Sequence, residues 1–179
     1  DIFRGHIIDV TPTTYTIDSK HTFAYFSYNH LGLTYQTHGF KKVTGKVVLD
    51  QENASGELEV SLDAKSLDTG FADFNSHLQG PDFSDTAKFP TITYKSKKFN
   101  WVGTSLQTIE GELTIKGITK PVAFVVNNFV CKPHPMLKKE ACGANALAQI
   151  SRTAFGMNKY VPGVADDVTL NIMVEAIKQ

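Results

Sequence analysis

Apolar and polar residues alternate along several stretches of the chain. Leu58, Val60 and Leu62 are each followed by a charged or hydroxyl-bearing residue, and the segment 168–176 repeats the pattern near the C-terminus. A period of two places successive side chains on opposite faces of a β-strand. Both segments are therefore predicted to be strands with one buried face and one face in water.

Further strands are predicted by the same alternation or by shorter runs of strand-favouring residues, with turn-forming residues between them. The segment 66–80 differs, because its apolar residues recur every three or four positions, which predicts one or two short helices. Many short strands in such an order are typical of a β-sandwich or a β-barrel. The additional predicted strands are 14–18, 23–31, 33–40, 43–50, 91–99, 109–115, 122–126 and 145–152.

The two cysteines, Cys131 and Cys142, are close in the sequence, and the residues between them are polar and interrupted by proline. This segment, 132–141, is predicted to be a long loop between strands. A disulfide that closes such a loop stabilises a protein by about 3 kcal/mol and persists in oxidising compartments. We therefore expect a Cys131–Cys142 bridge; the alternative is two unrelated thiols in a reducing compartment.

The chain contains 12 Phe, and many of its aromatic residues lie on or beside predicted strands. Two interpretations stay open at this point. The aromatic side chains either fill the interior of a barrel completely, or line an apolar lumen that takes a chain-like ligand. A barrel of about eight strands is the size at which one small ligand fits inside.

Charge and motifs exclude several classes of function. Lys plus Arg and Asp plus Glu are 18 each, so a net charge of zero provides no global attraction to nucleic acid. No apolar run is long enough to span a bilayer. The six histidines show no metal-binding spacing, and the nucleophile-elbow, P-loop and dinucleotide motifs are missing. No catalytic residue and no metal ligand are therefore predicted.

An ordered set of motifs carries a resemblance to a known family. The most specific is Gly-Glu-Leu-Thr-Ile-Lys-Gly-Ile-Thr-Lys-Pro-Val at 111–122. The others, in chain order, are the segment 15–21, His38-Gly39-Phe40, the segment 66–70, His77-Leu78, Asp82-Phe83, Phe89-Pro90 and Arg152 with Phe155-Gly156-Met157. With these motifs the chain resembles the YceI-like family, the periplasmic polyisoprenoid-binding proteins of bacteria, over roughly 14–178.

The resemblance implies an all-β fold, an antiparallel lipocalin-like β-barrel of about eight strands with one or two short helices. The barrel domain would cover 14–179, after an N-terminal extension over 1–13. It further implies a periplasmic or secreted protein whose signal peptide is already removed, and a homodimer as in several relatives. The implied partner is a long-chain lipid bound without a covalent bond, such as a polyisoprenoid, a fatty acid or a fatty amide, with no other cofactor.

The strand pattern and the resemblance together predict which residues meet the ligand. His77 and Arg152 are the candidates for contact with its polar head group; a helix-end hydrogen bond and a structural ion pair with an Asp are their alternative roles. Phe74 and Asn75 replace a charged pair of the family, which favours a neutral or amide-like head. The predicted lumen residues are Phe23, Phe26, Phe40, Leu58, Val60, Leu62, Phe71, Phe74, Leu78, Phe83, Tyr94, Leu113, Ile115, Phe124 and Ile172.

Three functions compete at the level of the sequence. The first is binding and transport or storage of a long apolar lipid, which needs an apolar lining and no activated nucleophile. The second is a filled barrel that acts through its surface in a stress response. The third is an enzyme acting on such a lipid, which needs a paired acid and base in the pocket. We expect the first function, and not an enzyme.

Overall fold

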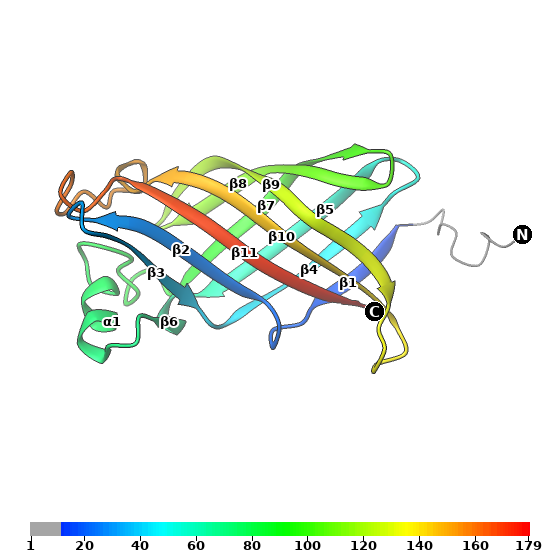
Figure 1. The fold of residues 1–179 in the computed structure, drawn as a ribbon, viewed down its shortest axis with the longest axis horizontal. Coiled ribbons are helices and arrows are strands. Elements are labelled where there is room, and N and C mark those ends of the chain that lie inside the picture. The colour runs from blue at the N-terminus through cyan, green and yellow to red at the C-terminus, as the bar shows by residue number, and fades with distance from the viewer. Residues whose placement is uncertain (1–11) are drawn as a thin grey trace, which may run out of the picture.

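The computed structural model describes residues 12–179, and antiparallel β-sheet dominates it (Figure 1). Its one α-helix in this range is α1 (Ala72–Leu78), and 3₁₀ helices cover Ala64–Ser66 and Arg152–Phe155. No helix among these residues is long and apolar enough to cross a membrane. The strands are β1 (Thr13–Ile17), β2 (Phe23–His30), β3 (Thr34–Phe40), β4 (Val43–Asp50), β5 (Ser55–Asp63), β6 (Leu67–Asp68), β7 (Thr91–Val102), β8 (Ser105–Ile115), β9 (Ile118–Pro133), β10 (Glu140–Ser151) and β11 (Asp167–Lys178).

The sheet closes into a barrel because β1 pairs with both β4 and β11. Strand β11 pairs with β1 near its own C-terminus and with β2 further back, so β1 and β2 lie in line as one bent strand. Strands β3 and β4, and likewise β5 and β6, are in line in the same way. The segments therefore occupy eight positions around the barrel, and the predicted antiparallel barrel with a short helix is confirmed.

The bend between β1 and β2 is held by a buried threonine. Asp18 N–H donates to the carbonyl of Glu175 at 2.8 Å, which ends the β1 pairing. The Thr22 hydroxyl then donates to the same carbonyl at 3.2 Å and accepts the Glu175 N–H at 3.1 Å. Thr22 is fully buried, and its side chain takes the place of the missing ladder hydrogen bonds to Glu175.

The predicted loop between the cysteines is wrong in its extent. Strand β9 continues to Pro133 and β10 begins at Glu140, so a short turn joins two long strands. Ladder pairing reaches as far as Glu140 opposite Pro133. Proline is tolerated there because it lies at the very end of its strand. The segment is a β-hairpin that projects from the barrel.

The two ends of the barrel carry different structures (Figure 1). At one end lie α1, the β2–β3 turn and the segment 152–166. At the other end lie the β4–β5 and β7–β8 turns, the C-terminus and the β9–β10 hairpin. The N-terminal extension expected over 1–13 lies outside the described residues except for its last two, of which Thr13 already belongs to β1.

Candidate functional site

The barrel encloses a cavity. Its volume is about 180 Å³, counted as the space open to the centre of a water molecule. A single water needs roughly 10–15 Å³ by the same measure, so the lumen is open rather than filled. The predicted lumen residues found on its wall are Phe26, Phe40, Leu58, Val60, Leu62, Tyr94, Leu113, Ile115, Phe124 and Ile172.

The cavity stays open because one side of the barrel carries small side chains. Strands β10 and β11 present Ala144, Ala146 and Ala176 to the lumen, with Gly143 beside them. Strands β7 to β9, of which β9 pairs with β10, present the large rings of Tyr94, Phe99, Phe124 and Phe129. Small residues leave space beside these rings, whereas large residues at every wall position would fill the interior.

Several wall residues were missed by the sequence analysis although the alternation could have identified them. Val43, Val47 and Leu49 share one face of β4, and Ile92 lies two residues before Tyr94. Each continues a period of two already recognised nearby. The alanines of β10 carried no such signal, because alanine is common on either face of a strand.

The polar side chains on the wall are hydrogen-bonded: those of Tyr94 and Thr22 to the backbone, and that of Tyr25 to the Lys41 ammonium. The Tyr94 ring lies over Gly111, where a Cβ would come within 2.6 Å of its hydroxyl oxygen. Only a glycine lets the ring cross β8, and the hydroxyl then donates to the Val122 carbonyl of β9 at 2.8 Å. Burial raises the pKa of Tyr94 above its ordinary value. With Thr22 also bonded to the backbone, the wall presents an essentially hydrocarbon surface.

Phe23 faces outward, which corrects its prediction as a lumen residue. It lies three positions before Phe26, and residues three apart in a regular strand point to opposite faces. Ala24 and Phe26 line the cavity, so Phe23 packs outside against Tyr25, with ring centroids 6.4 Å apart. The ammonium group of Lys41 lies 5.7 Å from the Phe23 ring centre on that outer face.

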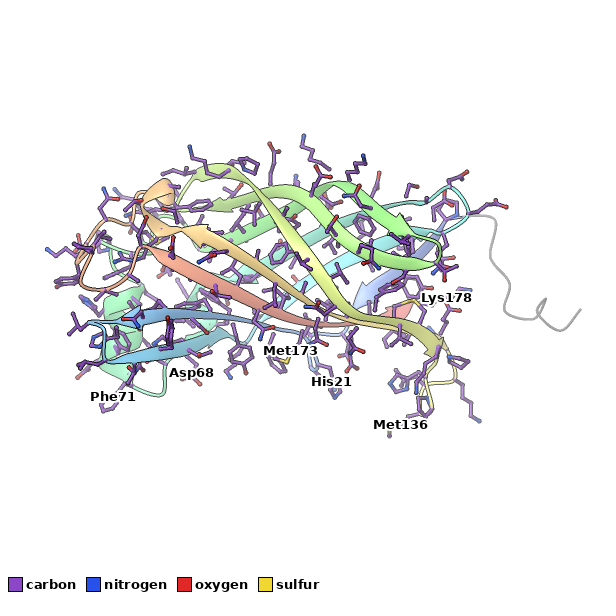
Figure 2. The ribbon with its side chains drawn as sticks, turned by 45° about the horizontal axis from the view of Figure 1, so that its top comes forward. His21, Asp68, Phe71, Met136, Met173 and Lys178 are labelled. Carbon is purple, nitrogen blue, oxygen red and sulfur yellow. A yellow bond between two sulfur atoms is a disulfide. The ribbon has the colours of Figure 1, made fainter. Side chains whose placement is uncertain are left out.

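The residues predicted around the helix do not line the cavity either. Phe71 precedes α1 and is 73% exposed, and Figure 2 shows it at the outer edge of the barrel end. Phe74, Leu78 and Phe83 are half-buried at this end, outside the cavity wall. Helical spacing predicted one apolar face correctly, but a helix of seven residues packs across the barrel end and sends no side chain into the lumen.

A buried aromatic cluster joins the helix to the barrel. The His38 ring packs edge-on against Phe26 at 5.7 Å and Phe74 at 5.3 Å. Its Nε2 is hydrogen-bonded to the Tyr28 hydroxyl at 2.8 Å, and burial lowers the pKa of His38. His38 was recognised only as part of a family motif; its contact with Phe74 could not be predicted from spacing.

His77 lies at the surface of the same end. It is exposed, and its ring lies 5.2 Å from that of Phe83 and 6.3 Å from that of Tyr160. These aromatic contacts place it near the barrel end but not on the cavity wall. Its contact with a ligand head group stays a prediction.

Arg152 has a structural role, which corrects its prediction as a head-group contact. Its side chain is buried and donates to four backbone carbonyls at 2.8–3.0 Å. The carbonyls belong to Met157, Lys159, Val164 and Ala165, so the guanidinium holds the loop after β10 in place. The alternative was a structural ion pair with an Asp. Asp166 lies near enough to attract the guanidinium, but its carboxylate accepts from Ser151 and Thr153, and the hydrogen bonds of Arg152 go to the carbonyls.

The expected disulfide is present between Cys131 and Cys142, which lie directly opposite each other on β9 and β10. Outside the barrel, Asp18, His21 and Glu175 place their ligand atoms within 4.8 Å of one another. His21 is exposed and hydrogen-bonded to Asp18 at 2.8 Å, which raises the pKa of His21 and lowers that of Asp18. This surface group has no connection to the cavity.

Comparisons with known proteins agree with this architecture. A family model described as the YceI-like domain matches residues 15–176. Protein YceI of Escherichia coli is 32% identical over 168 residues, which cover 92% of this chain and 87% of the relative. The Campylobacter jejuni YCEI crystal structure is 26% identical, with a TM-score of 0.73 over 84% of this chain and 90% of that chain.

A more distant structure shares the fold alone. A polyisoprenoid-binding domain from Saccharophagus degradans is 12% identical and has a TM-score of 0.67, over 93% of this chain and 99% of that domain. The match to the family model covers nearly the whole barrel, from β1 to β11. The chain thus has both the sequence motifs and the fold of these proteins, and it belongs to the YceI-like family.

Proposed function

We propose that the protein binds one long-chain, largely hydrocarbon lipid inside the barrel and carries or stores it. The observation that supports this most is the open cavity with a hydrocarbon wall. Burial of each CH₂ group stabilises a complex by about 0.8 kcal/mol, so roughly 16 carbons contribute about 12 kcal/mol before the cost of association. With an association cost of about 4 kcal/mol, tail burial alone leaves about 8 kcal/mol, which corresponds to micromolar binding.

The chemistry of the wall favours a ligand with an uncharged polar end. The side chains around the cavity carry no formal charge, and the hydroxyls of Tyr94 and Thr22 are already bonded to the backbone. A charged head group inside the lumen would lose its hydration without a partner. A polyisoprenoid, a fatty acid with its carboxyl group outside the cavity, or a fatty amide fits these conditions. The polyisoprenoid-binding domain that shares this fold supports the first of these classes.

The same wall argues for binding rather than catalysis. An enzyme acting on the bound lipid needs a general acid and base near the reacting bond. Tyr94 and Tyr25 are the titratable residues on the wall. The Tyr94 hydroxyl is held by Val122 and its pKa is raised, and the Tyr25 hydroxyl accepts a hydrogen bond from Lys41. The open volume speaks against a filled barrel that acts only through its surface.

The disulfide favours an oxidising compartment, and we propose the periplasm or another extracytoplasmic space. A carrier is useful there because a long apolar chain cannot cross water unaided.

The test is mass spectrometry of an organic extract from the purified protein, together with binding of a fluorescent long-chain probe after delipidation. Ala146 on the wall and Ala123 on the outer face form a matched pair of sites for the same substitution. Ala146→Phe fills the lumen and is expected to weaken probe binding more than about tenfold, because displacing two CH₂ contacts suffices for that loss. Ala123→Phe leaves binding unchanged.

An extract without lipid, combined with a delipidated protein that binds no long-chain probe, contradicts the proposal. Equal loss of binding in the two phenylalanine variants would also contradict it, because the effect would then not arise in the lumen.

A further inference from the structure

The β9–β10 hairpin projects from the barrel and carries two exposed apolar side chains at its tip. Met136 is 83% exposed and Leu137 is 52% exposed. Figure 2 shows Met136 beyond the end of the barrel, at the outermost point of the hairpin. Neighbouring large apolar side chains that are exposed at a projecting tip lower the solubility of a protein, and such sites often bind a membrane or another protein.

The tip is ordered by its own hydrogen bonds. The Nδ1 atom of His134 accepts the backbone N–H groups of Met136 and Leu137, each at 3.1 Å. His134 also donates its backbone N–H to Lys139 and accepts that of Lys138. The histidine side chain thus lies beneath the turn, and both apolar side chains point away from it into solvent. The Cys131–Cys142 bridge ties the two strands together below this turn.

Positive charge surrounds the apolar tip. Lys132, Lys138 and Lys139 are exposed, and no acidic residue lies between 128 and 139. Glu140, the first acidic residue after the turn, is hydrogen-bonded to the Tyr15 hydroxyl. The chain as a whole has a net charge of zero, so this local positive charge is not a consequence of a basic protein.

We propose that this hairpin tip docks on an anionic phospholipid bilayer. Apolar side chains that enter the interface and lysines that bind lipid phosphates are the features of interfacial membrane anchors. The choice of a bilayer over an acidic protein rests on the proposed function, since a lipid carrier has to collect its cargo from a membrane. The base of the hairpin also belongs to the cavity wall, through Phe129, Cys142 and Gly143.

The opposite end of the barrel is the less suitable surface for such a bilayer. It exposes Leu31, Leu33, Tyr35, Phe71 and Tyr160, but the acidic residues Asp68, Asp73 and Asp82 are exposed at that end as well. Their negative charge opposes contact with anionic lipid. The hairpin tip, 132–139, combines exposed apolar side chains with lysines and contains no acidic residue.

The experiment measures co-sedimentation of the full chain with vesicles of phosphatidylglycerol and phosphatidylcholine, and with vesicles of phosphatidylcholine only. The parent is expected to bind the anionic vesicles more tightly than the neutral ones. Met136→Ser with Leu137→Ser weakens binding to the anionic vesicles about tenfold. Replacement of Lys132, Lys138 and Lys139 by Gln weakens it at least tenfold, since each lysine near an anionic surface contributes roughly fivefold.

Matched controls separate the tip from general effects. Replacement of Lys95, Lys97 and Lys98 by Gln removes the same charge from the outer surface of the barrel, on β7, and leaves vesicle binding within twofold. Val102→Ser, at the exposed β7–β8 turn, removes an apolar side chain from another turn at the same end and also has no effect. Leu33→Ser tests the opposite end.

The docking proposal is overturned if the parent does not bind anionic vesicles, if the β7 lysine variant loses as much binding as the hairpin variant, or if Leu33→Ser alone abolishes binding. Failure of the docking leaves the lipid in the organic extract unchanged, whereas failure of the proposed function removes that lipid. The two proposals are therefore distinguishable.

Discussion

The two ends of the barrel are stabilised by different kinds of interaction. At the helical end, rings from β2, β3 and α1 pack around His38, and the buried Arg152 holds the following loop by four carbonyls. At the hairpin end, one disulfide and a few hydrogen bonds from His134 order a projecting turn. The helical end is therefore connected to the barrel core by buried side chains. The hairpin has no buried core of its own, and the disulfide holds its two strands together instead.

The largest effect is expected at the helical end. Arg152→Ala removes four charge-assisted hydrogen bonds and leaves their carbonyls without a donor, so the free energy of unfolding should fall by about 3–4 kcal/mol. Urea denaturation measures this, with the exposed Lys159→Ala as a control that changes stability by less than about 0.5 kcal/mol. Unchanged stability combined with lost lipid binding would return Arg152 to the role of a head-group contact.

At the hairpin end, removal of the disulfide should have a slightly smaller effect. Cys131 and Cys142 are 11 residues apart, and bridging a loop of this length stabilises by about 3 kcal/mol in the loop-entropy model. Replacement of both cysteines by Ser should lower the free energy of unfolding by up to this amount. A thiol assay on the unfolded, unreduced parent should detect no free thiol, and two free thiols would contradict the bridge.

A substitution in the middle of the barrel, at Gly111 on β8, allows its effect on stability to be compared with the effects expected at the two ends. Gly111→Ala introduces a Cβ within about 2.6 Å of the Tyr94 hydroxyl and 2.5 Å of the Lys95 carbonyl. Such overpacking typically costs about 1–3 kcal/mol, and the displaced ring enters the lumen. We therefore expect lower stability together with weaker binding of the long-chain probe. Full probe affinity in this variant would show that Tyr94 does not define the width of the lumen.

The smallest effects concern two histidines in opposite environments. NMR titration should give His38 a pKa below 6.5, because burial disfavours its charged form, and His21 a pKa above 6.5, because of Asp18. The stabilisation of the folded state by neutral His38 is lost as pH falls below 6.5, because the unfolded chain then binds the proton more readily than the folded protein does. The stabilisation by charged His21 is complete below 6.5 and disappears as pH rises through its folded pKa. Asp18→Asn should remove most of the upward shift in the pKa of His21, leaving the smaller effect of Glu175, and should leave His38 unchanged.

Local alternation predicted most of the barrel and much of its wall. Leu58, Val60 and Leu62 face the cavity because a strand repeats every two residues, and this holds without knowledge of its neighbours. The sequence prediction broke that rule at Phe23, because Phe23 and Phe26 cannot both face inward from one regular strand. The cysteines indicated their bridge, but the strands reached further toward the turn than their proline content predicted.

What only the tertiary structure decided depends on residues far apart in the sequence. The lumen is open because the alanines of β10 and β11 leave space beside the rings of β7 to β9 in the closed barrel, and neither set is informative alone. Arg152 is structural because a loop that follows it folds back and presents its carbonyls. The sequence by itself determined which side chains share a face of a strand and which cysteines pair, because both depend on residues close together along the chain. The cavity volume and the hydrogen-bond partners of Arg152 depend instead on residues that only the fold brings together.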